Sequence, residues 1–232
     1  MGERREDYFT FMNGAELLLA LTTTTTPALP GGGLLGLALP VMWAFVLAGC
    51  VCALAPRLPY RCRLGLTVLM AAWALIPGSH SITYWLGLAF QMPSLMTGLI
   101  CAGWLVAGLT RWRPFKASRL GLDRVGLIGI ALGWLLMLDT LALMPWSIYS
   151  LGFGMAALAL VSAFVVLLWV LTGGNAHWIH WNHGLALTAA VLALFVVTRL
   201  PTGNLWDALI DPWLWVFLQV VWLRRLWGQR RA

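Results

Sequence analysis

Long apolar segments alternate with short polar segments along the chain, with the spacing of a protein that crosses a membrane many times. A helix that crosses the hydrocarbon core of a bilayer needs roughly 20 mostly apolar residues. Segments near this length recur, and proline, glycine or clustered charges separate them. The pattern predicts an all-α, polytopic bundle of seven or eight transmembrane helices, at residues 8–27, 34–54, 64–76, 94–110, 125–143, 151–171, 185–197 and 213–223.

Two segments depart from this pattern. Residues 8–27 contain Asn13, Glu16 and a run of threonines, whose hydroxyls can bond back to helix carbonyls. We expect this segment to span the membrane in the eight-helix arrangement; a half-buried interfacial helix gives the seven-helix alternative. Residues 79–92 are apolar but too short for a full crossing. For them we predict an outer interfacial or re-entrant segment.

The most basic stretch, residues 111–124, lies near the middle of the chain and has one acid, Asp123. Short basic loops stay in the cytoplasm, so this stretch orients its neighbours. With eight helices and both termini inside, all of the fifteen Lys and Arg residues except Arg199 are cytoplasmic. We therefore predict an inner-membrane protein with a cytoplasmic C-terminus and a cytoplasmic N-terminus. The side chains expected to anchor the loop to anionic headgroups are Arg111, Arg113, Lys116, Arg119 and Arg124.

The composition supports membrane insertion. The chain is 61% hydrophobic and 10% charged, whereas soluble domains are about 45–50% apolar and about 25% charged. The formal net charge of +7 would suit a nucleic-acid partner. Because the basic residues lie in short clusters between apolar segments, the predicted partner is instead the lipid bilayer, and no nucleic acid is expected.

The basic loop separates two apolar halves, residues 1–110 and 125–232, within one membrane domain. Residues 65–75 align with residues 184–194 at one constant offset, with five identities in eleven. Two related four-helix halves would explain the match, and chance similarity of Gly-, Ala- and Leu-rich helices is the alternative. A Pro–Trp–Pro pattern follows each segment, at Pro77, Trp85 and Pro93 and at Pro201, Trp206 and Pro212.

Acids within predicted helices are candidates for transport chemistry. Asp139 lies in the segment 125–143 and Glu16 in the segment 8–27. An Asp at the centre of a spanning helix costs about 2.5–3.5 kcal/mol on the insertion scale. Such acids usually face a bundle interior or a wet cavity and often relay protons or ions. Interfacial solvation and helix–helix hydrogen bonding are the alternatives.

A second pair of acids lies in the predicted outer loop. Asp207 and Asp211 are four residues apart, a spacing that would place both on one helix face. There they could bind a cation or pair with Arg199, and capping before Pro212 is the alternative.

Histidines cluster in residues 175–183, the stretch NAHWIHWNH. Neutral imidazoles at the spacing of His177, His180 and His183 could bind Zn, Cu or Fe. Near pH 6.5 they could also sense protons. The alternative is an interfacial loop in which Trp and His match the headgroup layer, since no neighbouring carboxylate or cysteine completes a metal set.

Common catalytic motifs are absent from the sequence, including H-E-x-x-H, the P-loop, G-x-S-x-G and the dinucleotide glycine fingerprint. No pattern identifies a cofactor. The leading hypothesis is therefore a non-enzymatic subunit or accessory protein of a membrane complex, with other membrane subunits or further copies of itself as partners. The alternatives are a small-solute or ion transporter that uses Asp139 and Glu16, and a metal- or redox-handling protein that uses His177, His180 and His183.

Overall fold

The computed structural model describes residues 29–110, 124–171 and 179–229, and these residues form helices without a strand. The all-α prediction is therefore confirmed. Three short helices, α4 (Ile82–Phe90), α7 (Ile148–Leu151) and α10 (Leu205–Leu209), lie between longer ones. The longer helices are α2 (Gly32–Leu54), α3 (Tyr60–Leu75), α5 (Leu95–Leu109), α6 (Arg124–Thr140), α8 (Met155–Leu171), α9 (Ile179–Thr198) and α11 (Pro212–Gln229).

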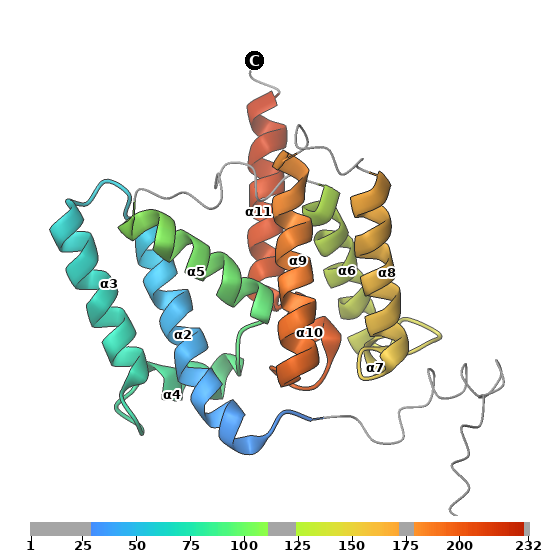
Figure 1. Ribbon diagram of the computed structural model, residues 1–232, viewed down its shortest axis with the longest axis horizontal. Helices are drawn as coiled ribbons and strands as arrows, with labels where there is room; N and C mark the ends of the chain where they lie inside the picture. Colours follow the sequence, from blue (N-terminus) through green and yellow to red (C-terminus); the bar gives the residue numbers. More distant parts are fainter. Residues whose placement is uncertain (1–28, 111–123, 172–178, 230–232) are drawn as a thin grey trace, which may run out of the picture.

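The long helices form two groups that stand side by side (Figure 1). In the first, α2 packs between α3 and α5; in the second, α9 contacts α8 and α6, and α6 contacts α11. Helix α5 joins the groups because it also contacts α9 and α10. The short helices α4, α7 and α10 lie at one end of the bundle, which we call the short-helix end (Figure 1).

The opposite end of the bundle is basic. Helix α2 ends there, α3 and α6 begin there, and α11 ends there (Figure 1). This basic end holds Arg57, Arg61, Arg63, Arg124, Arg224 and Arg225, whereas Arg199 follows α9 at the short-helix end.

Polar side chains define where several helices begin. The hydroxyls of Ser81 and Ser94 accept hydrogen bonds from backbone N–H groups in the first turns of α4 and α5. Asn204 and Asp211 do the same for α10 and α11. Each cap satisfies a donor that the helix itself leaves unpaired.

Helices α2 and α5 approach closely through glycine. A Cβ atom on Gly49 would lie 2.4 Å from the carbonyl oxygen of Cys101, and one on Gly108 would lie 2.6 Å from the Cβ of Cys52. Small residues of this kind let two backbones pack together in an apolar environment, where burial alone provides little drive for association.

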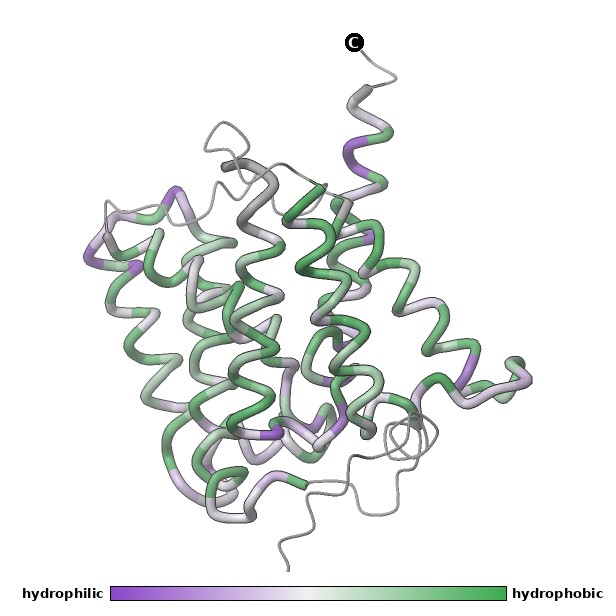
Figure 2. Tube along the Cα trace, turned by 45° about the vertical axis from the view of Figure 1, so that its right-hand side comes forward, coloured by the Kyte–Doolittle hydropathy of each residue, from purple (hydrophilic) through white to green (hydrophobic). Residues whose placement is uncertain are grey.

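The outer surface of the bundle is strongly apolar. Buried hydrophobic residues gather where α5, α8, α9 and α10 meet, with Val191, Phe195 and Leu205 at the centre. Away from that core, large hydrophobic side chains are exposed, including Leu160 at 69% and Leu171 at 70% on α8. Hydrophilic residues gather toward the two ends of the bundle (Figure 2).

Among the described residues, α2 is the helix whose length and apolar composition suit a membrane crossing by themselves. Four further apolar helical stretches are shorter, at Leu95–Leu109, Val125–Thr140, Met155–Leu171 and Gly184–Thr198.

The helices agree with the sequence pattern except at their ends and in the connections. Residues 79–92, predicted as an interfacial or re-entrant segment, contain the short helix α4. The expected connections 144–150 and 198–212 each contain a short helix, α7 and α10, that hydropathy did not indicate. Helix α9 begins at Ile179, six residues before the predicted start at 185. Residues 8–27, with Glu16, lie outside the described residues.

Candidate functional site

Asp139 lies one residue before the end of α6, at the short-helix end of the bundle. Its Oδ2 accepts a hydrogen bond of 2.6 Å from the backbone N–H of Tyr149, which belongs to α7. The side chain is half-buried. Asp139 therefore connects α6 to the short helix that follows it in the chain.

Tyr149 continues this connection to α10. Its hydroxyl donates a hydrogen bond of 2.7 Å to Oδ2 of Asp207, and the hydroxyl of Thr202 donates to the same oxygen. Burial, together with the hydrogen bond and charge of Asp207, raises the pKa of Tyr149 to about 12. The phenol is thus held protonated, in the state that donates to the carboxylate.

Asn204 is the buried centre of the same region, with 0% of its surface exposed. Its Nδ2 donates to the carbonyl oxygen of Tyr149 at 3.0 Å, and its Oδ1 accepts from the backbone N–H of Trp206 at 2.9 Å. The indole Nε1 of Trp206 donates to the carbonyl oxygen of Ile148. We call the set Asp139, Tyr149, Thr202, Asn204, Trp206 and Asp207 the α7–α10 network.

Gly152 allows α7 and α10 to meet. Its carbonyl oxygen accepts a hydrogen bond from the backbone N–H of Leu205 at 2.9 Å. A Cβ atom at this position would lie 1.9 Å from Oδ1 of Asn204, so a side chain here would displace the network. Close approach of the two segments therefore requires glycine.

Asp211 connects the two groups of helices. Its Oδ2 accepts from the backbone N–H of Ser94 at the start of α5, and its Oδ1 accepts from the backbone N–H of Leu214 in α11. One carboxylate thus caps α11 and fixes the start of α5, as expected for an anion at helix N-termini.

The shared helix face predicted for Asp207 and Asp211 is wrong. Helix α10 ends at Leu209, and Ile210 between it and Asp211 is extended. The capping alternative for Asp211 is confirmed. The guanidinium of Arg199 lies over the ring of Phe195, 5.2 Å from its centroid.

At the basic end, Arg63 connects α3 to α5. Its Nη2 donates a hydrogen bond of 2.7 Å to the carbonyl oxygen of Gly108, in the last turn of α5. A cation at this position satisfies a carbonyl that the helix leaves unpaired and complements the helix dipole.

The predicted histidine cluster falls at the beginning of α9. His180 and His183 belong to the helix and not to a connecting loop, while His177 lies outside the described residues. Among the basic-loop residues, Arg124 begins α6; Arg111, Arg113, Lys116 and Arg119 also lie outside the described residues. In the part of the chain with described side chains, no group of three or more His, Cys, Asp or Glu could hold a metal ion.

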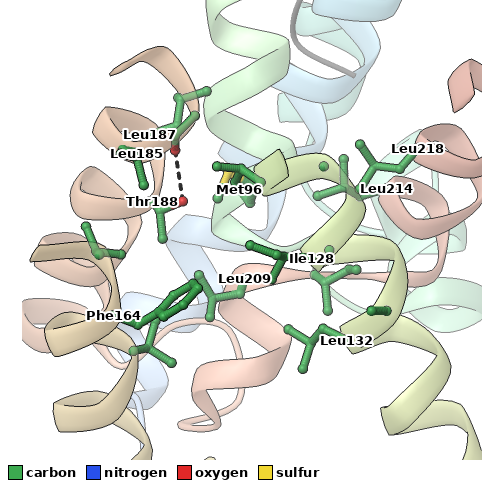
Figure 3. Close-up of a pocket in the computed structure, with 18 of the residues that line it drawn as sticks. Met96, Ile128, Leu132, Phe164, Leu185, Leu187, Thr188, Leu209, Leu214 and Leu218 are labelled. Atoms are coloured by element: carbon green, nitrogen blue, oxygen red, sulfur yellow. Dashed lines mark hydrogen bonds between the residues drawn. The ribbon is translucent and has the colours of Figure 1, made fainter. Parts of the chain in front are cut away.

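An apolar cavity of about 370 Å³ lies in the second group of helices (Figure 3). Helices α5, α6, α8, α9, α10 and α11 all contribute to its wall. Its polar residues are Thr188 and Trp206. The hydroxyl of Thr188 donates to the carbonyl oxygen of Gly184, as the dashed line in Figure 3 shows, and the indole of Trp206 donates to Ile148. The cavity therefore presents hydrocarbon to an occupant.

Sequence reasoning missed this cavity and most of the α7–α10 network. Asn204 in the stretch TGN before an apolar segment is a helix-start signal and could have revealed α10. Nothing local indicates that Tyr149 and Asp207 meet across 58 residues. Asp139 belongs to the α7–α10 network and does not line the cavity.

Comparison with known proteins returned no matching family model, no matching curated protein and no matching solved structure.

Proposed function

We propose that this chain is a multi-pass inner-membrane protein that works as a non-enzymatic subunit or accessory protein of a membrane complex. The observation that supports it best is the outward face of α8, where Leu160, Leu167 and Leu171 are 69%, 52% and 70% exposed. Soluble monomers rarely expose contiguous apolar patches of more than a few hundred Å². A bilayer or an intramembrane partner would cover such a face.

The polar groups support a structural role for the same region. Asp139, Asp207 and Asp211 each accept hydrogen bonds that hold one helix against another or cap it. Carboxylates used in this way hold the ends of the helices in place, which supports a structural role for these acids.

The lengths of the seven long helices among the described residues support the proposed membrane crossings. At 1.5 Å per residue, the lengths of the long helices range from about 22 Å for α5 to about 35 Å for α2. The hydrocarbon core of a bilayer is about 30 Å thick. The short helices at one end of the bundle and local thinning of the bilayer compensate for long helices that fall short of the hydrocarbon thickness. The described arginines lie at the basic end apart from Arg199, which supports a cytoplasmic location for that end.

The order of elements supports two related halves. Helices α3, α4 and α5 repeat the order long, short, long that α9, α10 and α11 show. Each short helix contains the tryptophan of the Pro–Trp–Pro pattern, Trp85 in α4 and Trp206 in α10. The halves meet where the capping residues Ser94 and Asp211 bond to each other. Equivalent positions in contact are what a pseudo-symmetric pair of repeats produces.

The experiment has two parts. Alkaline carbonate extraction of membranes is expected to leave the chain in the pellet, and release into the supernatant would contradict membrane insertion. Affinity purification of the full chain in mild detergent is then expected to yield a partner protein at constant stoichiometry. A monodisperse preparation of the chain alone would contradict the subunit role.

If the protein is instead a transporter, Asp139 is the residue expected to carry the proton or ion. An Asn side chain can accept the same hydrogen bond from Tyr149, so Asp139→Asn removes the charge while keeping the contact. If Asp139 carries a proton or ion, flux into liposomes disappears in this variant. Flux that survives would remove Asp139 from that role.

A further inference from the structure

The apolar cavity opens sideways through the surface of the bundle. Along α6 its lining includes Ile128, Ala131 and Leu135, and on α8 it includes Phe164. These residues are exposed, with Ile128 at 39%, Leu135 at 41% and Phe164 at 42%. Positions 128, 131 and 135 share one face of a helix. The opening therefore lies between α6 and α8, on the surface that acyl chains of a bilayer would contact.

One end of the cavity reaches the basic end of the bundle. Val125 and Gly184 line it there, and a Cβ atom on Gly184 would lie 3.3 Å from the side chain of Val125. Gly129 approaches Leu218 and Gly133 approaches Trp215, so α6 and α11 run antiparallel. This register places Arg124, the first residue of α6, near the level of Arg224 in α11. The cavity thus ends in the first turn of α6, toward the level of Arg224 in α11.

These two features together suit an amphipathic anion. The wall offers hydrocarbon contacts and no unused hydrogen-bonding group, because Thr188 and Trp206 are both bonded within the protein. An apolar cavity of this kind does not hold water well. Basic residues near a membrane surface attract anionic headgroups, each by about 1 kcal/mol.

We propose that the cavity binds one acyl chain of an anionic phospholipid, whose headgroup lies at the basic end, near Arg224 and the first turn of α6. The proposal rests on the membrane insertion proposed above. Because lipid tails are as apolar as the wall, the choice of lipid comes from packing in the cavity and from the headgroup charge. The bound lipid fills the space between α6 and α8.

The test places a photoreactive residue at the mouth of the cavity. Ala131 is exposed and lines the cavity, whereas Ala163 on α8 is exposed and lies outside it. Benzoylphenylalanine replaces one or the other in the full chain, which is reconstituted into vesicles of equimolar phosphatidylcholine and phosphatidylglycerol with identical chains. After irradiation, the mass of the intact protein reports which lipid has been attached.

At position 131 we expect phosphatidylglycerol adducts to exceed phosphatidylcholine adducts roughly fivefold, the factor that about 1 kcal/mol from one basic side chain gives. At position 163 the two adducts should follow the vesicle composition. The same ratio at both positions would overturn the lipid site. A cross-link from position 131 to residues 8–27, to a second copy or to another protein would overturn it in favour of a helical occupant. Absence of lipid adducts at both positions would instead contradict membrane insertion itself.

Discussion

At the scale of single residues, Asn204 is the side chain on which the α7–α10 network depends most. It is fully buried, donates to the carbonyl oxygen of Tyr149 and accepts from the backbone N–H of Trp206. Asn204→Ala leaves both backbone groups without their partner and removes the cap of α10. We expect a loss of about 2 kcal/mol in the free energy of unfolding, within the range for an unsatisfied buried group and a lost cap. Thermal unfolding followed by tryptophan fluorescence in detergent measures it.

The matched control for this prediction is Asn204→Ser. Serine keeps an oxygen that can cap α10 but loses the amide donor to Tyr149, so its unfolding temperature should lie between those of the wild type and Asn204→Ala. Equal unfolding temperatures for the wild type and Asn204→Ala would show that the network does not hold α7 against α10.

Tyr149 predicts a dependence of stability on alkaline pH. Burial and Asp207 raise its pKa from the ordinary value of 10.0 to about 12. A phenol with a higher pKa in the folded state holds its proton more tightly when folded. Its contribution to stability is therefore complete below a pH of about 10 and is lost as the pH rises through about 12.

The measurement compares unfolding temperatures of the wild type and Tyr149→Phe from pH 8 to pH 12. The phenylalanine variant should be less stable at pH 8, since Asp207 loses the hydroxyl that donates to it. The difference should shrink at the alkaline limit, where the wild-type phenol is itself ionised. A difference that stays constant across this range would contradict the role assigned to Tyr149.

At the scale of elements, the contact between α2 and α5 depends on Gly49. A Cβ atom there would lie 2.4 Å from the carbonyl oxygen of Cys101, in the backbone of α5. Gly49→Ala should cost about 1–3 kcal/mol because the two helices must move apart. Gly36 offers a control in the same helix, since a Cβ atom there has nothing within 4 Å. Gly36→Ala should be neutral or stabilise α2 by about 0.5–1 kcal/mol. Similar unfolding temperatures for the two variants would contradict close α2–α5 packing.

Substitution of Asp211 should destabilise two helices, α5 and α11, at once. Its two oxygens accept from the backbone N–H groups of Ser94 and Leu214. Asp211→Ala removes both bonds and should lower the free energy of unfolding by about 2–3 kcal/mol. Asp211→Asn keeps one accepting oxygen and should lose about half of that, as measured by urea or thermal unfolding. An alanine variant as stable as the asparagine variant would show that only one of the two bonds matters.

The elements also show what the sequence could predict. Long helices such as α2 and α8 follow from uninterrupted apolar runs, because hydropathy depends on local composition alone. The short helices α7 and α10 have four and five residues and depend on distant partners, such as the bond from Leu205 to Gly152. The sequence shows Asp139 as an acid within an apolar segment, but its hydrogen bond with Tyr149 of α7 follows from tertiary folding. The cavity likewise forms from six separate elements, and no single segment encodes it.

At the scale of the whole molecule, the ends of the bundle differ in chemistry. The short-helix end carries the described carboxylates Asp139, Asp207 and Asp211, while most described arginines lie at the basic end. Positive residues are retained on the cytoplasmic side of a membrane, whereas acids contribute little to orientation. The asymmetry therefore predicts that the basic end faces the cytoplasm.

Natural Cys62 makes this orientation testable in the full chain. It is an exposed free thiol in the first turn of α3, at the basic end, while Cys50 is half-buried and Cys52 and Cys101 are buried. A membrane-impermeant maleimide should fail to label Cys62 in intact spheroplasts and should label it once the membrane is permeabilised. Trp146, which is 74% exposed at the short-helix end, supplies the matched position. In a Cys62→Ser background, Trp146→Cys should be labelled without permeabilisation.

Labelling of Cys62 in intact spheroplasts together with protection at position 146 would reverse the orientation. Labelling of both would contradict a bundle that crosses the membrane, because a spanning bundle must keep its two ends on opposite sides.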